Sequence, residues 1–172
     1  MKKVFITGIS GTGKTTIAHA LNIKCIHSIS IDEVPGLCVW KNKVSGKKVD
    51  YEVELNKDFI ETHDWICDVE ILQKLLDAEK ETVVVLGIAA NQNEFLGLFD
   101  KILLLQCKPE TFIERIMQRK DNDFGKDKSA QDIILSWYQE FERDLLKKGA
   151  ITINVEGSID EVIETIINEI LV

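Results

Sequence analysis

The feature that most constrains the fold is a glycine-rich stretch near the start of the chain. Residues 8–15 read GISGTGKT, with the apolar run KVFIT before them and a helix-like segment after them. Ordering a glycine costs more conformational entropy than ordering any other residue. Three glycines within six residues are therefore expected where the backbone must turn tightly or approach another group closely. The stretch predicts a strand at 3–7, then a tight loop, then a helix.

Four further apolar runs indicate strands of the same kind. They lie at 24–31, 82–88, 101–107 and 150–155, and helix-like stretches separate them. Continuous apolar strands that alternate with helices are typical of a parallel sheet covered on both faces. The chain has 172 residues, of which 45% are hydrophobic, and this suits one domain with a full core. We therefore expect a single α/β domain over residues 1–172.

Polar residues mark the ends of two helices. Ser129 with Asp132, and Ser158 with Glu161, form capping-box patterns ahead of apolar helical stretches. Gly149 follows the first of these stretches and is expected to end it.

Two stretches have turn residues and charge but little periodicity, at 32–57 and 120–128. Loops without regular structure in a compact domain are often lids or binding loops. Both stretches are therefore predicted to be functional.

The composition argues against several classes of function. A formal net charge of −8 disfavours a broad nucleic-acid surface, which needs many cations facing the phosphates. No apolar run approaches the roughly 18 residues of a membrane span, and the opening segment is too short in apolar residues for a secretory signal. The four cysteines and three histidines show no metal-ligand spacing. We expect a cytoplasmic protein with a small-molecule substrate and neither nucleic acid nor membrane as a partner.

The glycine-rich stretch matches the pattern G-x-x-x-x-G-K-[ST] in the context that the pattern requires, between a strand and a helix. Without side chains at the glycines, successive backbone N–H groups can turn inward as an anion nest, and the helix that follows adds its positive end. Lys14 is expected to reach the β- and γ-phosphates of a nucleotide, and the Thr15 hydroxyl to ligate Mg²⁺. The predicted phosphate-binding residues are Gly8, Ser10, Gly11, Thr12, Gly13, Lys14, Thr15 and Thr16.

Phosphoryl transfer also needs a carboxylate near the magnesium. The strand at 82–88 ends without one, whereas Asp32 and Glu33 follow the strand at 24–31. At the carboxyl edge of a parallel sheet both would face the phosphate cleft. Asp32 is predicted to hold Mg²⁺ through water or to accept the proton of an attacking hydroxyl. The alternative is a turn-starting aspartate ahead of Pro35.

Two arginines supply candidate cations for the migrating phosphoryl group. Arg115 and Arg119 are four residues apart on one helix edge, where like charges repel by roughly 0.2–0.5 kcal/mol. A bound phosphate would relieve this repulsion, so both are predicted to be catalytic. The alternative is a solvated basic helix end, which the helix dipole favours in any case.

With these motifs the sequence resembles the P-loop small-molecule kinases, a family that includes nucleoside monophosphate kinases and shikimate kinase. The resemblance rests on GISGTGKT, on Asp32 after the second strand, and on the Arg-x-x-x-Arg helix that leads into 120–128. It implies a three-layer α/β/α fold with a five-stranded parallel sheet in the order 2-3-1-4-5. It also implies ATP with Mg²⁺, a LID at about 120–128 and a substrate-binding segment at about 33–64.

The same resemblance implies that Arg119 packs near the adenine, with the turn that contains Glu156 on the other side. One departure concerns the acceptor: no arginine occurs between residues 1 and 114, so the arginine that grips an acceptor phosphate in nucleotide kinases is missing. Cations for a phosphorylated acceptor would have to come from Lys41, Lys43, Lys47 or Lys48. The amides of Asn91, Gln92 and Asn93, with Trp40 and Trp65, suit a polyol or a nucleoside instead.

Three functions follow from this reading. The first is an ATP-dependent kinase that phosphorylates a nucleoside, a nucleotide or a hydroxylated metabolite. The second is an adenylate-kinase-shaped ATPase that acts as a nucleotide-dependent switch or assembly factor. The third is a nucleotide-binding module without catalysis.

Overall fold

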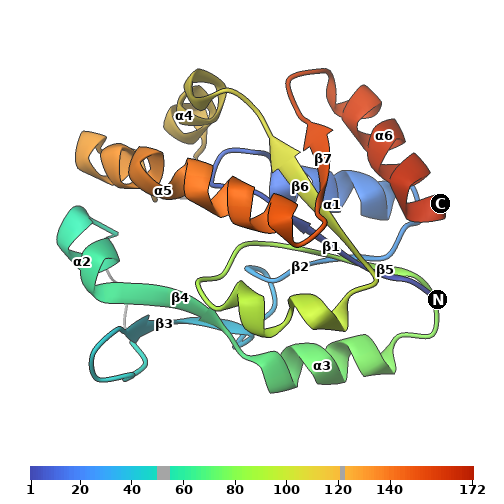
Figure 1. Ribbon diagram of the computed structural model, residues 1–172, viewed down its shortest axis with the longest axis horizontal. Helices are drawn as coiled ribbons and strands as arrows, with labels where there is room; N and C mark the ends of the chain where they lie inside the picture. Colours follow the sequence, from blue (N-terminus) through green and yellow to red (C-terminus); the bar gives the residue numbers. More distant parts are fainter. Residues whose placement is uncertain (50–54, 121–122) are drawn as a thin grey trace.

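A five-stranded parallel sheet forms the centre of the computed structural model, which describes residues 1–49, 55–120 and 123–172 (Figure 1). The strands follow the order β2-β5-β1-β6-β7. Their bounds are β1 (Lys3–Thr7), β2 (Ser28–Ser30), β5 (Val83–Leu86), β6 (Lys101–Gln106) and β7 (Ile151–Asn154). When the five strands of this sheet are numbered 1 to 5 along the chain, their order is 2-3-1-4-5. This is the predicted order, which the structure confirms. All five expected strands are present, and most are shorter than the apolar runs that predicted them.

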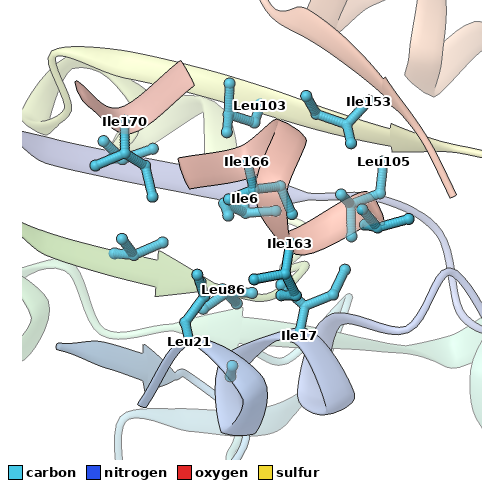
Figure 2. Packing of buried hydrophobic residues seen from close by; sticks show 14 of the residues in the cluster. Ile6, Ile17, Leu21, Leu86, Leu103, Leu105, Ile153, Ile163, Ile166 and Ile170 are labelled. Carbon is cyan, nitrogen blue, oxygen red and sulfur yellow. The ribbon is translucent and has the colours of Figure 1, made fainter. Parts of the chain in front are cut away.

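Helices cover both faces of the sheet. On one face, α1 (Lys14–Ile23) and α6 (Ile159–Leu171) share a buried apolar cluster with β1, β5, β6 and β7, which Figure 2 shows. On the other face, α3 (Val69–Ala78), the short helix η2 (Leu96–Leu98) and the end of α5 (Lys128–Lys147) share a second cluster, and the short helix η1 (Gln92–Glu94) precedes η2. The expected three-layer α/β/α arrangement is therefore confirmed.

The central strand β1 shows why the strands read as continuous apolar runs. Successive side chains of a strand point to opposite faces. Val4 and Ile6 belong to the cluster of α1 and α6, whereas Phe5 belongs to the opposite one, and all three are fully buried. Burying a side chain such as Phe5 stabilises the fold by about 2 kcal/mol.

The two predicted capping boxes have different outcomes. At α6 the box is confirmed: the Ser158 hydroxyl accepts from the Glu161 backbone N–H, and the Glu161 carboxylate accepts from the Ser158 N–H at 2.9 Å. At α5 the prediction is wrong, because Asp127 is the cap, and its carboxylate accepts from the Ala130 N–H at 2.9 Å. Ser129 lies inside the first turn, and its hydroxyl donates to Asp127. An ionised carboxylate is a stronger acceptor than a hydroxyl, so the helix begins earlier than expected.

A second sheet lies outside the parallel one and was not predicted. Strands β3 (Cys38–Asn42) and β4 (His63–Cys67) pair antiparallel, and α2 (Lys57–Thr62) precedes β4. We call β3 and β4 the hairpin. Figure 1 shows it with α2 beneath α5 at the left of the view, and α2 contacts α5. The remaining helix, α4 (Pro109–Gln118), has its proline in the first turn, where no backbone N–H is needed.

Two buried cysteines face each other across the hairpin. Cys38 and Cys67 are direct partners, and the Asp68 N–H donates to the Leu37 carbonyl at 2.8 Å. This pattern places the cysteines at a non-hydrogen-bonded position, where opposed side chains come closest. The hydrogen bond between their thiols raises the pKa of Cys38 and lowers the pKa of Cys67.

Within the described ranges, no helix combines the length and apolar character needed to cross a bilayer.

Candidate active site

The loop between β1 and α1 requires its glycines for two separate reasons. Gly11 and Gly13 have φ of +86° and +91°, in the left-handed region that side chains disfavour. A Cβ on Gly11 would also lie 2.4 Å from the carbonyl oxygen of Phe112 in α4, and one on Gly8 would lie 2.9 Å from the carbonyl oxygen of Leu105. The backbone therefore turns in the way an anion nest requires and packs against β6 and α4 without room for side chains.

Lys14 folds its ammonium group back over this loop. Its Nζ donates to the carbonyl oxygens of Gly8 at 2.6 Å and Ile9 at 2.9 Å. The residue as a whole is half-buried, but its ammonium is enclosed, and this burial lowers its pKa to about 8. The carboxylate of Asp32 opposes the shift, and the positive charge of Arg119 adds to it. A positive group held away from water in this manner binds an anion strongly when one arrives.

A cavity of about 1160 Å³ opens beside the loop. Pockets for one small ligand usually have about 300–1,000 Å³, so this one has room for a nucleotide and a second molecule. Its walls come from the glycine-rich loop, the end of β2, the hairpin, residues 88–93, α4 and α5. The predicted site residues that line it are Ser10, Gly11, Thr12, Gly13, Lys14, Thr15, Thr16, Asp32, Arg115 and Arg119.

Asp32 stands at the carboxyl end of β2, as the parallel sheet requires. Its Oδ1 accepts a hydrogen bond from Trp65 Nε1 in β4 at 2.9 Å. Thr15, at the start of α1, lines the same cavity, so a hydroxyl and a carboxylate are present together. Oxygen ligands of this kind fit Mg²⁺. Glu33, the neighbouring carboxylate, instead lies 3.1 Å from Nε2 of His19.

Both predicted arginines reach the cavity from α4. Arg115 donates from Nη2 to the Val155 carbonyl at 2.8 Å. Arg119 caps the end of α4 and donates to the carbonyl of Phe124, a residue that also lines the cavity. Residues 121–122 of the predicted LID at 120–128 lie outside the described residues. In the described part of this segment, Lys126 Nζ lies 2.7 Å from Asp123 Oδ1.

Glu156 holds the start of α4 through hydrogen bonds. Its carboxylate accepts from the Lys108 N–H at 2.7 Å and from the Thr111 hydroxyl at 2.9 Å, which caps the start of α4. These hydrogen bonds lower the pKa of Glu156. Its neighbours Val155 and Gly157 line the cavity, whereas Glu156 itself is not among the lining residues that are described.

Aromatic side chains form another part of the cavity wall. Trp40 and Trp65 are opposite each other in the hairpin, with ring centroids 5.3 Å apart. Trp137 and Phe141 of α5 line the same cavity. In the sequence these two fall at four-residue spacing with Ile133 and Leu145, as on the buried stripe of a helix, but in the structure both are only half-buried. An aromatic residue on a helix stripe does not reveal whether it faces a core or a cavity, so they were missed.

The three neighbouring amides after β5 have different roles. Asn91 clamps the hairpin, since its amide group exchanges two hydrogen bonds with the backbone of Cys67, each of 2.9 Å. Gln92 and Asn93 line the cavity, as the sequence suggested. Gln92 accepts from the Thr7 hydroxyl at 3.3 Å, and Asn93 accepts from Lys148 Nζ at 2.8 Å.

Comparison with known proteins assigns this arrangement to a family. A family model described as an AAA domain, AAA_18, matches residues 4–135. The chain belongs to this AAA-domain family. A search of curated protein sequences finds no match for it.

Solved structures share the fold of this AAA-domain protein. Deoxyadenosine kinase from M. mycoides is 18% identical, with 98% of each chain covered and a TM-score of 0.58. Shikimate kinase from Acinetobacter baumannii is 16% identical, with 99% of this chain and 93% of the other covered and a TM-score of 0.59. A gluconokinase from Sinorhizobium meliloti is 15% identical, with 99% and 91% covered and a TM-score of 0.56. At these identities the similarity establishes the fold, which is that of the P-loop small-molecule kinases.

Proposed function

We propose that this AAA-domain protein transfers the γ-phosphoryl group of ATP to a hydroxyl group of a small molecule. The observation that carries the proposal is the continuity of the cavity. It runs from the glycine-rich loop and Lys14 past Asp32 to the aromatic hairpin. A nucleotide switch would need only the first part, whereas a kinase needs room for an acceptor beside the phosphates. The kinases of the same fold support this choice.

The loop would hold the triphosphate by its backbone N–H groups and by the positive end of α1. Lys14 would leave the two carbonyl oxygens and bind the β- and γ-phosphates, and the guanidinium groups of Arg115 and Arg119 would face the migrating group. The Thr15 hydroxyl would ligate Mg²⁺ directly and Asp32 would reach it only through water, which leaves one Asp32 oxygen for the acceptor; Mg²⁺ would supply further charge neutralisation when it is bound.

The acceptor hydroxyl would approach from the hairpin side. Its oxygen forms the new bond to the γ-phosphorus while the bond to the β–γ bridging oxygen breaks, and ADP leaves. Asp32 orients this hydroxyl and accepts its proton. Since one carboxylate oxygen is held by Trp65, the other is the oxygen that serves the acceptor. Positioning and electrostatics supply most of the rate enhancement in such a reaction.

The test measures ADP formation with MgATP and a panel of hydroxylated acceptors. Lys14→Met should abolish acceptor-dependent turnover while its unfolding transition remains cooperative. Lys24→Met, an exposed lysine at the other end of α1, is the matched control and should keep full activity. ADP that forms without any acceptor and increases with a protein partner would instead establish the switch ATPase. Unchanged turnover in Lys14→Met would overturn the assignment of the site.

A further inference from the structure

The two ends of the cavity differ in charge. At the end beside the loop, the charged side chains are Lys14, Arg115 and Arg119. At the other end, which we call the acceptor end, the lining carboxylates are Asp32, Glu33, Asp64 and Asp144, and the lining cations are Lys43 and Lys148. The acceptor end therefore has four lining carboxylates and two lining cations, although Asp32 also acts on the charge of Lys14 and Asp144 lies 3.6 Å from Lys147. Such a lining offers few cations to a phosphate or a carboxylate.

The two lysines of the acceptor end already have partners. Lys43 lies 3.5 Å from Asp64 and donates to the Glu61 carbonyl at 2.9 Å. Lys148 donates to Asn93 at 2.8 Å. Of the lysines considered from the sequence as phosphate ligands, Lys43 alone is among the described residues that line the cavity. Asp32 accepts a neutral indole N–H from Trp65, and no ion pair joins it to a cation in the part of the chain that the structure describes, where Lys14 acts on it at longer range.

Aromatic rings define the shape of the acceptor end. All three tryptophans of the chain line the cavity, although tryptophan is usually placed in cores and interfaces. Trp40 is braced by Phe59, with ring centroids 5.3 Å apart, and by Trp65 at the same distance. Braced, half-exposed indoles of this kind provide flat apolar surfaces for stacking with a planar ring, and they attract cations to their faces.

Trp65 joins the ring-binding wall to the proposed base. Its indole faces Trp40 on the neighbouring strand β3 and donates through Nε1 to Asp32 in the turn after β2. A ring that stacks on this wall is therefore close to the carboxylate that would receive the hydroxyl proton. Gln92 and Asn93 add amide groups that suit the edge of a heterocycle.

From these observations, and resting on the proposed kinase function, we infer that the acceptor is an uncharged or cationic alcohol that bears a planar ring, such as a nucleoside. We expect a nucleotide, a sugar acid or another anionic alcohol to bind there more weakly, because carboxylates outnumber cations in the lining of the acceptor end. The proposal concerns only which hydroxyl compound binds there, so it fails separately from the transfer of phosphate.

Intrinsic tryptophan fluorescence tests the inference without any turnover. The protein is first saturated with Mg²⁺ and a non-hydrolysable ATP analogue, and the four nucleosides and their 5′-monophosphates are then titrated. At least one nucleoside should change the fluorescence saturably, and its monophosphate should bind more than about ten-fold more weakly. A monophosphate, gluconate or shikimate that binds better than every nucleoside would overturn the inference.

Two variants separate recognition from folding. Trp40→Ala should weaken the nucleoside by about ten-fold or more, whereas Trp40→Phe, which keeps a ring, should weaken it less. Asp64→Asn removes a negative charge and frees Lys43, so it should improve the binding of the monophosphate relative to the nucleoside by about five-fold. If Asp64→Asn leaves this ratio unchanged, charge does not select the acceptor and the inference fails. If phosphoryl transfer occurs but only to anionic alcohols, the kinase function stands and the inference falls.

Discussion

The buried ammonium of Lys14 has a consequence for stability that can be measured without a ligand. In the folded protein its pKa is about 8, against an ordinary value of 10.5. At pH 7 both the folded and the unfolded chain carry the proton. Between pH 8 and 10.5 the unfolded chain keeps a proton that the folded chain has lost, so the free energy of unfolding rises with pH. The stabilisation that Lys14 contributes is therefore complete above its pKa in the unfolded chain, and it is lost as the pH falls through its pKa in the folded chain.

The magnitude follows from the two pKa values. Each pKa unit corresponds to about 1.36 kcal/mol, and integration of the titration from pH 7 to pH 9 gives a gain of about 1.3 kcal/mol. Lys14→Met keeps the length of the side chain and removes the titration. The free energy of unfolding of the wild type should therefore increase relative to that of Lys14→Met by about 1.3 kcal/mol over this range.

Urea denaturation at pH 7, 8 and 9 measures this difference, in a buffer free of phosphate and sulfate because either anion could occupy the loop. Other groups that titrate in the range contribute equally to both proteins and cancel. Lys24→Met, which alters an exposed lysine of the same helix, should show no such trend against the wild type. Saturating MgADP should abolish the trend, because a phosphate beside the ammonium raises its pKa. A wild-type advantage that stays constant from pH 7 to 9 would refute the burial of this group.

Three further predictions concern stability. Gly11→Ala should lower the free energy of unfolding by more than about 2 kcal/mol. Gly13 has a similar φ but nothing within 4 Å of the new Cβ, so Gly13→Ala should lower it by only about 1 kcal/mol. Equal losses in denaturant titrations would show that the contact of Gly11 with α4 is unimportant. Ser158→Ala removes the cap of α6 and should cost about 1 kcal/mol, measured in the same way, and a neutral result would contradict its role. Glutathione disulfide should oxidise Cys38 and Cys67 to a disulfide, which peptide mass spectra would show as the loss of two hydrogens. This disulfide should raise the free energy of unfolding by about 3 kcal/mol. A mixed disulfide with glutathione that does not go on to the Cys38–Cys67 disulfide would contradict the direct pairing of the two cysteines in the hairpin.

Much of the scaffold could be predicted because its determinants are local. The apolar runs, the glycine-rich loop and the capping box of Ser158 with Glu161 each act within a few residues of the chain. Their order along the chain then leaves few topologies for a parallel sheet. The placement of Lys14, Thr15 and Asp32 in one cavity follows from the same rule, since the carboxyl ends of parallel strands lie at one edge.

The acceptor end, by contrast, was decided by contacts between distant parts of the chain. The segments at 38–42 and 63–67 are too short to show a pattern, and each is a strand because it pairs with the other. The hydrogen bond from Trp65 to Asp32 depends on how this hairpin docks.

The sequence by itself determined the five strands and the glycine-rich loop, and its resemblance to the P-loop small-molecule kinases implied the order of the strands. Only the tertiary structure decided that Glu156 caps α4, that α5 turns two aromatic rings toward a cavity, and that the pKa of Lys14 falls to about 8. The physical reason is that local propensity and loop chemistry are properties of neighbouring residues. Burial, register and the partner of a polar group depend instead on residues that folding brings together from far apart in the chain.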